Sequence, residues 1–138
     1  MYRLHIHVSV PELDEAIEFY SALFAASPTS IKDGYAKWML DDPGLNFAVS
    51  VNSSAGRTGL HHVGIQAETE EEFHALGQRL LETKRHTVDE HHVHCCYAIG
   101  DKSTVVDPAG LEWETFITHG DSPHWSTTYV EPNEDQHT

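Results

Sequence analysis

The chain has 138 residues, a length typical of one domain with its own hydrophobic core. Acidic residues outnumber basic ones 22 to 8, and the resulting net charge of −14 disfavours binding to nucleic acid or to anionic membrane surfaces. No apolar run is long enough to span a bilayer, and the first residues do not resemble a signal peptide. We therefore expect a cytoplasmic protein that engages neither nucleic acid nor membrane.

Two residue types are unusual in this sequence. There are 12 histidines, and the only two cysteines, Cys95 and Cys96, are adjacent. Adjacent cysteines close only a small, strained disulfide ring, so they do not suit a structural disulfide. In a reducing compartment they stay thiols that can bind a soft ion.

The first predicted elements are a strand and a helix. Alternating apolar residues in 4–10 predict a half-buried strand, and Pro11 suits the first turn of the helix that follows. Acidic residues sit near the expected positive end of this helix. Its apolar face is predicted to contain Leu13, Ile17, Tyr20 and Phe24.

The same pattern returns in the second half of the chain. Residues 62–67 again predict a strand, and Thr69 to Glu72 form a capping-box pattern that opens a helix. The apolar residues of this helix are Phe73, Leu76, Leu80 and Leu81. Turns at Asp42-Pro43 and Asp107-Pro108 each lead into an apolar strand, as in a hairpin.

The repeat predicts two modules, each made of a strand, a helix and about three strands. We expect one domain, with module one at 1–52, a linker at 53–59, module two at 60–120 and a polar C-terminal tail at 121–138 whose last eight residues are frayed. This arrangement over roughly residues 1 to 120 resembles the vicinal oxygen chelate superfamily, the glyoxalase and extradiol-dioxygenase class. The resemblance implies an α+β fold of two tandem βαβββ modules whose curved sheets surround a metal.

The resemblance places metal ligands on the first and last strands of each module, at His5, Ala48, His62 and Glu114. Ala48 cannot bind a metal, so the implied ligands are His5, His62 and Glu114. Two imidazoles and one carboxylate with open positions are typical of non-haem Fe(II) oxygenases, although Mn, Ni, Co or Zn can replace the iron. A histidine on a strand is more often a surface or hydrogen-bonded core residue, but the equivalence of His5 and His62 in the repeat favours ligands.

The alternation of side chains along a strand predicts which side three neighbouring residues face. His7 shares the face of His5 and is a candidate to support the metal ligands without binding the metal, whereas His61 is expected to face away from His62. Glu112 shares the face of Glu114, and either supports that ligand or is an exposed rim residue.

Cys95 and Cys96 are expected at the start of a strand, after a polar run at 89–94 that favours a loop. Neighbouring side chains on a regular strand point to opposite faces, so chelation by both thiols needs a loop or bulge. Thiolates select soft centres such as trivalent arsenic or cadmium. The alternative is two small buried apolar residues.

A narrower resemblance rests on the segments 95–102 and 106–116, with support from 34–43, 46–48 and 120–121. They are similar to the organoarsenical carbon–arsenic lyases and to the related cadmium-induced proteins. The resemblance implies a cytoplasmic enzyme that uses Fe(II) and O₂ to cleave trivalent methyl- or aryl-arsenicals to arsenite. The substrate is then captured by Cys95 and Cys96, beside Tyr97.

The roles of several residues stay open at this point. Lys102 either stabilises developing negative charge or lowers a thiol pKa, or it is an exposed surface lysine. Tyr97 and Trp113 either line a pocket or pack in the core. Ser103-Thr104 replaces aromatic residues of the family and indicates a wider, more polar pocket. Either a second metal site formed together with the thiols or a solvated loop explains His91, His92 and His94.

Two other functions compete with the lyase. One is a non-catalytic resistance protein that sequesters cadmium or another soft ion, and the other is a glyoxalase-type or other dioxygenase-type metalloenzyme. The intact set of His5, His62 and Glu114 favours catalysis over sequestration, because structural metal sites fill their coordination shell. A homodimer formed by exchanging modules is as compatible with the repeat as a complete site in one chain.

Overall fold

The computed structural model describes residues 1–51, 57–95, 98–121 and 128–129, with the backbone alone for residues 93–95, 98, 121, 128 and 129. The chain forms two compact units. We call residues 2–65 the N-terminal unit, and residue 1 together with residues 66–138 the C-terminal unit. Each unit is described by itself.

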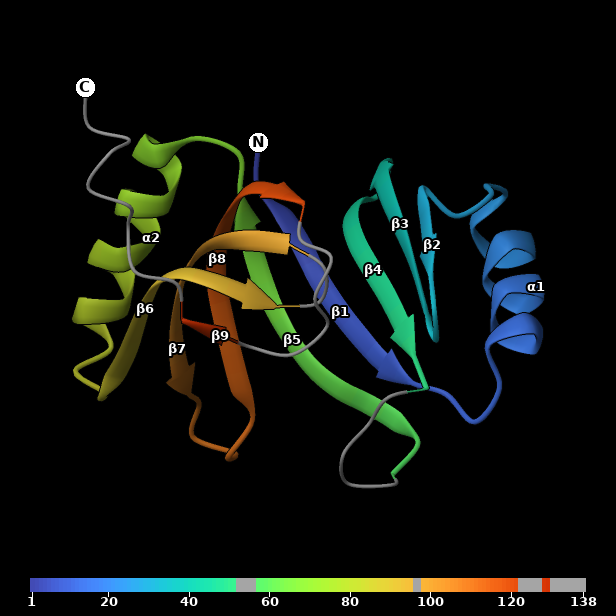
Figure 1. Ribbon diagram of the computed structural model, residues 1–138. Coiled ribbons are helices and arrows are strands. Elements are labelled where there is room, and N and C mark those ends of the chain that lie inside the picture. The colour runs from blue at the N-terminus through green and yellow to red at the C-terminus, as the bar shows by residue number, and fades with distance from the viewer. Residues whose placement is uncertain (52–56, 96–97, 122–127, 130–138) are drawn as a thin grey trace. The chain divides into compact units, whose positions relative to one another are not determined.

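The N-terminal unit is a curved sheet with one helix (Figure 1). Within it the strands lie in the order β2-β3-β4-β1-β5, where β1 pairs with β4 in parallel and β3 pairs with its neighbours in antiparallel fashion. The elements are β1 (Arg3–Ser9), α1 (Leu13–Phe24), β2 (Ser30–Lys32), β3 (Tyr35–Asp41), β4 (Gly44–Ser50) and β5 (Gly59–Ala67). Strand β5 belongs to this unit up to Ile65.

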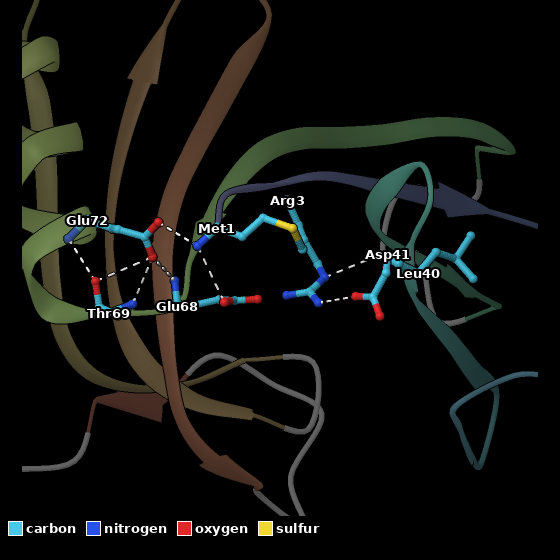
Figure 2. Close-up of polar contacts among 7 residues, drawn as sticks. All are labelled: Met1, Arg3, Leu40, Asp41, Glu68, Thr69 and Glu72. Atoms are coloured by element: carbon cyan, nitrogen blue, oxygen red, sulfur yellow. Dashed lines mark hydrogen bonds and ion pairs between the residues drawn. The ribbon is translucent and has the colours of Figure 1, made fainter.

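Aromatic residues dominate the core of the N-terminal unit. Trp38 of β3 is fully buried, and its indole Nε1–H donates to the carbonyl of Ala26 at 3.0 Å. The Tyr20 ring lies 4.5 Å from that of Phe47. The predicted apolar face of α1 packs against this core as expected, through Leu13, Ile17, Tyr20 and Phe24. Arg3 joins two strands of the same unit, because it donates to the Leu40 carbonyl and pairs with Asp41 at 2.6 Å (Figure 2).

The C-terminal unit contains the second helix and four further strands, in the order β8-β7-β6-β9 (Figure 1). Its elements are α2 (Glu70–Glu82), β6 (Thr87–Cys95), β7 (Ala98–Val106), β8 (Glu112–Asp121) and β9 (Thr128–Tyr129). The predicted succession of strand, helix and three strands is therefore present twice, from β1 to β4 and from β5 to β8. The short strand β9, which pairs with Val93 and His94 of β6, lies in the tail where no element was predicted.

Helix α2 begins with the predicted capping box. The Thr69 hydroxyl accepts from the Glu72 N–H at 3.1 Å, and the Glu72 carboxylate accepts from the Thr69 N–H at 3.2 Å. The Met1 amino group pairs with the same carboxylate at 2.7 Å (Figure 2). Of the four apolar residues expected in this helix, Leu76 is buried, whereas Leu81 is 65% exposed. Neither α1 nor α2 is long and apolar enough to cross a membrane.

Candidate metal centre and thiol strand

His5 and His62, the two histidines that match in the repeat, lie together in the N-terminal unit. His5 is on β1 and His62 is on β5, and each side chain is buried. Their Nε2 atoms are 3.1 Å apart. Two nitrogens bound to one ion at a right angle, each at about 2.1 Å, are about 3 Å apart, so this spacing suits two ligands of one metal.

Hydrogen bonds at the far sides of both rings prepare them to bind a cation. The His5 Nδ1–H donates to the backbone carbonyl of Asn46 at 3.1 Å, and because a carbonyl only accepts, the Nε2 of the neutral ring carries a lone pair. The Nδ1 of His62 lies 2.8 Å from the Nδ1 of His61. When His62 donates in that contact, two Nε2 lone pairs face each other, an arrangement that a metal ion stabilises.

His7 is the third imidazole of this cluster. Donor atoms of His5, His7 and His62 lie within 4.8 Å of one another, so the three rings can hold a metal ion by themselves. His7 Nε2 also shares a hydrogen bond with the Ser50 hydroxyl at 2.8 Å. Burial, with smaller contributions from the adjacent imidazoles, lowers the pKa of His7 from 6.5 to about 2. The ring is therefore neutral, which is the state that binds metals.

His61 lies beside the cluster, although the alternation of the strand predicts that it faces away from His62. Its side chain is exposed, yet its ring stacks on that of His7 with centroids 5.1 Å apart and contacts His62 through Nδ1. Ala48, the position equivalent to Glu114 in the repeat, pairs with His7 between β1 and β4 and offers no ligand atom.

Glu114 lies on β8 of the C-terminal unit and pairs with Lys102 of the neighbouring strand β7. Its Oε1 is 3.5 Å from the Nζ of Lys102, and the same Nζ is 3.4 Å from Glu90 Oε2 on β6. The Lys102 side chain is only 16% exposed, so it is not a free surface lysine. Glu112, two residues before Glu114, is exposed, in agreement with the rim alternative.

Cys95 lies at the end of a strand and not at its start. Cys95 is the last residue of β6, and its backbone pairs with that of Ala98, the first residue of β7. Residues 89–94 belong to β6 and are not a loop, because they pair with β7 on both sides of a bulge. Cys96 and Tyr97 lie outside the described residues, as does the side chain of Cys95, so their predicted contacts stay predictions.

The remaining sequence candidates make contacts within the C-terminal unit. Trp113 is half-buried, and its indole Nε1–H donates to Asp107 Oδ2 at 3.2 Å. Ser103 is buried and donates to Asp89 Oδ1 at 2.6 Å. His91 and His92 are exposed on the bulge of β6, near Asp101.

Comparison with known proteins agrees with this architecture. Residues 3–115 match the model of the glyoxalase/bleomycin resistance protein/dioxygenase superfamily. Among solved structures, an extradiol ring-cleaving dioxygenase from B. fuscum superposes with a TM-score of 0.59 at 17% identity, over 94% of this chain and 34% of that one. A methylmalonyl-CoA epimerase from Streptomyces coelicolor superposes with a TM-score of 0.53 at 16% identity, over 84% of this chain and 96% of that one. These similarities show the fold alone.

Similarity in sequence extends further. The chain is 42% identical to the trivalent organoarsenical cleaving enzyme of Bacillus sp. strain MD1, over 94% of this chain and 84% of the relative. It is 34% identical to the enzyme of that name from Thermomonospora curvata, over 88% and 81%. It is 37% identical to the cadmium-induced protein CadI of Mycobacterium tuberculosis, over 88% and 80%. The chain therefore belongs to the glyoxalase/bleomycin resistance protein/dioxygenase superfamily.

Proposed function

We propose that this protein cleaves the carbon–arsenic bond of trivalent methyl- or aryl-arsenicals and releases arsenite, using Fe(II) and O₂. The observation that carries the proposal is the similarity, along nearly the whole chain, to relatives named as trivalent organoarsenical cleaving enzymes. The acidic chain repels phosphate backbones, and it acts here on a small molecule in a reducing cytoplasm.

The metal is held by His5, His62 and Glu114. Two neutral imidazoles and a carboxylate leave open positions for further ligands, which is the donor set that non-haem Fe(II) oxygenases use. The hydrogen bond from His5 to the Asn46 carbonyl fixes the ring so that Nε2 stays available. His7, neutral and buried against the pair, maintains the cluster or supplies a further nitrogen. When bound, the ion supplies the activation of O₂ that carbon–arsenic cleavage requires.

Lys102 acts as a positioning residue in this proposal. Its ammonium lies between Glu90 and Glu114, two carboxylates that would otherwise repel each other. It therefore holds the Glu114 carboxylate in a fixed position. Its other expected role, the stabilisation of negative charge that develops on the substrate, stays a prediction.

Cys95 and Cys96 capture the substrate. Each thiol gives up its proton as its sulfur replaces one hydroxyl group of the trivalent arsenic, so that two sulfur–arsenic bonds form, two arsenic–oxygen bonds break and two waters leave. Capture brings the arsenic-bound carbon to the metal as an intramolecular reactant, which removes much of the entropic cost of the encounter. Tyr97 borders the captured arsenical.

The test begins with protein loaded anaerobically with Fe(II) and mixed with a trivalent methylarsenical, followed by O₂. Inorganic arsenite, measured by chromatography coupled to mass spectrometry, is the expected product. Cys95→Ser and Glu114→Ala are each expected to lower the rate at least about 100-fold, because one loses capture and the other a ligand. Glu112→Gln, on the same strand as Glu114 but exposed, is the matched control and keeps the wild-type rate.

Bound iron separates the contributions of the ligands from those of the thiols. His62→Gln and Glu114→Ala are expected to lower the iron content, whereas Cys95→Ser retains it. Lys102→Met weakens iron binding about tenfold and Lys102→Arg restores it, since the charge between the carboxylates is what matters. If the protein binds the arsenical without releasing arsenite and its cysteines bind cadmium tightly, the proposed lyase activity is wrong and the sequestering function is favoured. Light scattering tests for the homodimer that module exchange predicts.

A further inference from the structure

A second cluster of metal-binding side chains lies wholly within the C-terminal unit. It joins Glu70 at the start of α2, Asp101 on β7 and His119 on β8, whose donor atoms lie within 4.8 Å of one another. His119 Nε2 is 3.1 Å from Asp101 Oδ2 and 3.5 Å from Glu70 Oε1. The cluster shares no residue with the proposed catalytic site.

Two strand irregularities on either side of Asp101 bring these side chains together. In the β6–β7 pairing, His91 and His92 together stand opposite Asp101, and His92 has a positive φ of 51°. In the β7–β8 pairing, Ile99 faces Gly120 and Gly100 faces Thr118, so that His119 is an extra residue. Bulges of this kind redirect side chains and are frequent beside functional sites.

The second bulge requires a glycine at position 100. A Cβ added to Gly100 would lie 2.0 Å from the Ile117 carbonyl oxygen. The close backbone approach that places His119 beside Asp101 is therefore built into the sequence.

The central carboxylate is held ready to bind a cation. Its Oδ2 faces Nε2 of the His119 ring, and its Oδ1 accepts from a backbone N–H. The His92 N–H lies 2.9 Å from Oδ1. His91 Nδ1 is 3.7 Å from the same oxygen, so a further imidazole lies beside the cluster.

We propose that Glu70, Asp101 and His119 form a second site for a borderline divalent cation such as Zn²⁺ or Ni²⁺, with His91 as the fourth ligand. Mixed imidazole and carboxylate donors suit these ions, whereas Ca²⁺ and Mg²⁺ prefer all-oxygen sites. The ion links α2, β7 and β8, and through His91 it also reaches β6, the strand that ends at Cys95. Because it binds the folded chain, it stabilises that unit.

The experiment measures Zn²⁺ binding by competition with a chromophoric chelator in the full chain. At a free Zn²⁺ concentration that just fills this site in the wild type, wild-type protein is expected to bind more Zn²⁺ per chain than His119→Gln or Glu70→Gln, because each of these changes weakens the site at least about tenfold. Glu70 is exposed, so its substitution leaves the fold intact, as circular dichroism checks. His86→Gln, an exposed histidine outside the cluster, is the control and retains the wild-type number of ions.

A second measurement separates this site from the proposed catalytic one. Zn²⁺ is expected to raise the thermal midpoint of His62→Gln, in which the catalytic ligand set is broken, but to raise that of His62→Gln/His119→Gln less. Equal ion numbers in wild type, His119→Gln and Glu70→Gln would overturn the proposal. So would a loss in His86→Gln as large as that in His119→Gln, because it would indicate unspecific binding to surface histidines.

Discussion

Asp107 shows how one side chain fixes a turn in the C-terminal unit. Its Oδ1 accepts from the backbone N–H groups of Ala109 and Leu111 at 2.8 and 3.0 Å, and its Oδ2 accepts from the Trp113 indole. The Leu111 N–H lowers the pKa of Asp107 most, and the Trp113 and Ala109 bonds and Arg85 act in the same direction, against a raising effect of burial. The ionised carboxylate is therefore the form that the folded turn needs.

The sign of the pH dependence follows from the lowered pKa. The pKa of Asp107 is lower in the folded chain than its ordinary value of 3.8, which is that of the unfolded chain. The stabilising effect of the carboxylate is therefore complete above pH 3.8 and is lost as the pH falls through the folded pKa. We expect Asp107→Ala to destabilise the protein more at about pH 7 than at about pH 3. Urea unfolding at both pH values measures this, with Asp42→Asn in the matching turn of module one as the control. An equal loss at both pH values would contradict the prediction.

At the scale of the elements, two glycines of the C-terminal unit predict opposite outcomes for the same substitution. Gly77 lies inside α2 with nothing within 4 Å of an added Cβ, so Gly77→Ala is expected to stabilise the protein by about 0.5–1 kcal/mol. In Gly100→Ala the new Cβ meets the Ile117 carbonyl, and we expect a loss of about 1–3 kcal/mol from the displaced strands. Chemical denaturation of both variants beside wild type decides this, and a stable Gly100→Ala would mean that the β8 bulge is not needed.

The elements also show what the sequence can and cannot predict. The repeat predicted both βαβββ modules, the apolar face of α1 and the capping box of α2, because each has a regular period or a fixed spacing. Bulges have neither. The extra residues at His91-His92 and at His119 leave no mark in a pattern of alternation, so the sequence favours a loop at 89–94, where the structure has part of the strand β6.

In the candidate site too, the sequence predicts only those contacts between distant residues that follow from the repeat. His5 and His62 were identified because they occupy equivalent positions, and they do lie together. The contact of His61 with His62 was missed because parity assumes that neighbouring side chains on a strand diverge. Asp101 and His119 are separated along the chain and have no counterpart in module one, so only the fold brings them together.

At the scale of the whole molecule, the net charge of −14 predicts self-repulsion in the folded state. Raising NaCl from about 0.01 M to about 1 M shortens the screening length from about 30 Å to about 3 Å. We expect the thermal midpoint to rise over this range, measured by calorimetry on chelator-treated protein so that bound cations do not contribute. A midpoint that falls with salt would show that specific ion pairs, such as Arg3–Asp41, outweigh the repulsion.

The positions of the tryptophans have a practical consequence. Trp38 is fully enclosed among the aromatic rings of the N-terminal unit, whereas Trp113 is tied to the Asp107 turn of the C-terminal unit. The chain thus carries a separate intrinsic fluorophore in each unit. Once Trp125, which lies outside the described residues, is replaced by Phe, single-tryptophan versions retaining Trp38 or Trp113 report the melting of the two halves in turn. Coincident emission curves would then identify a single cooperative transition, and staggered ones would reveal which half opens first.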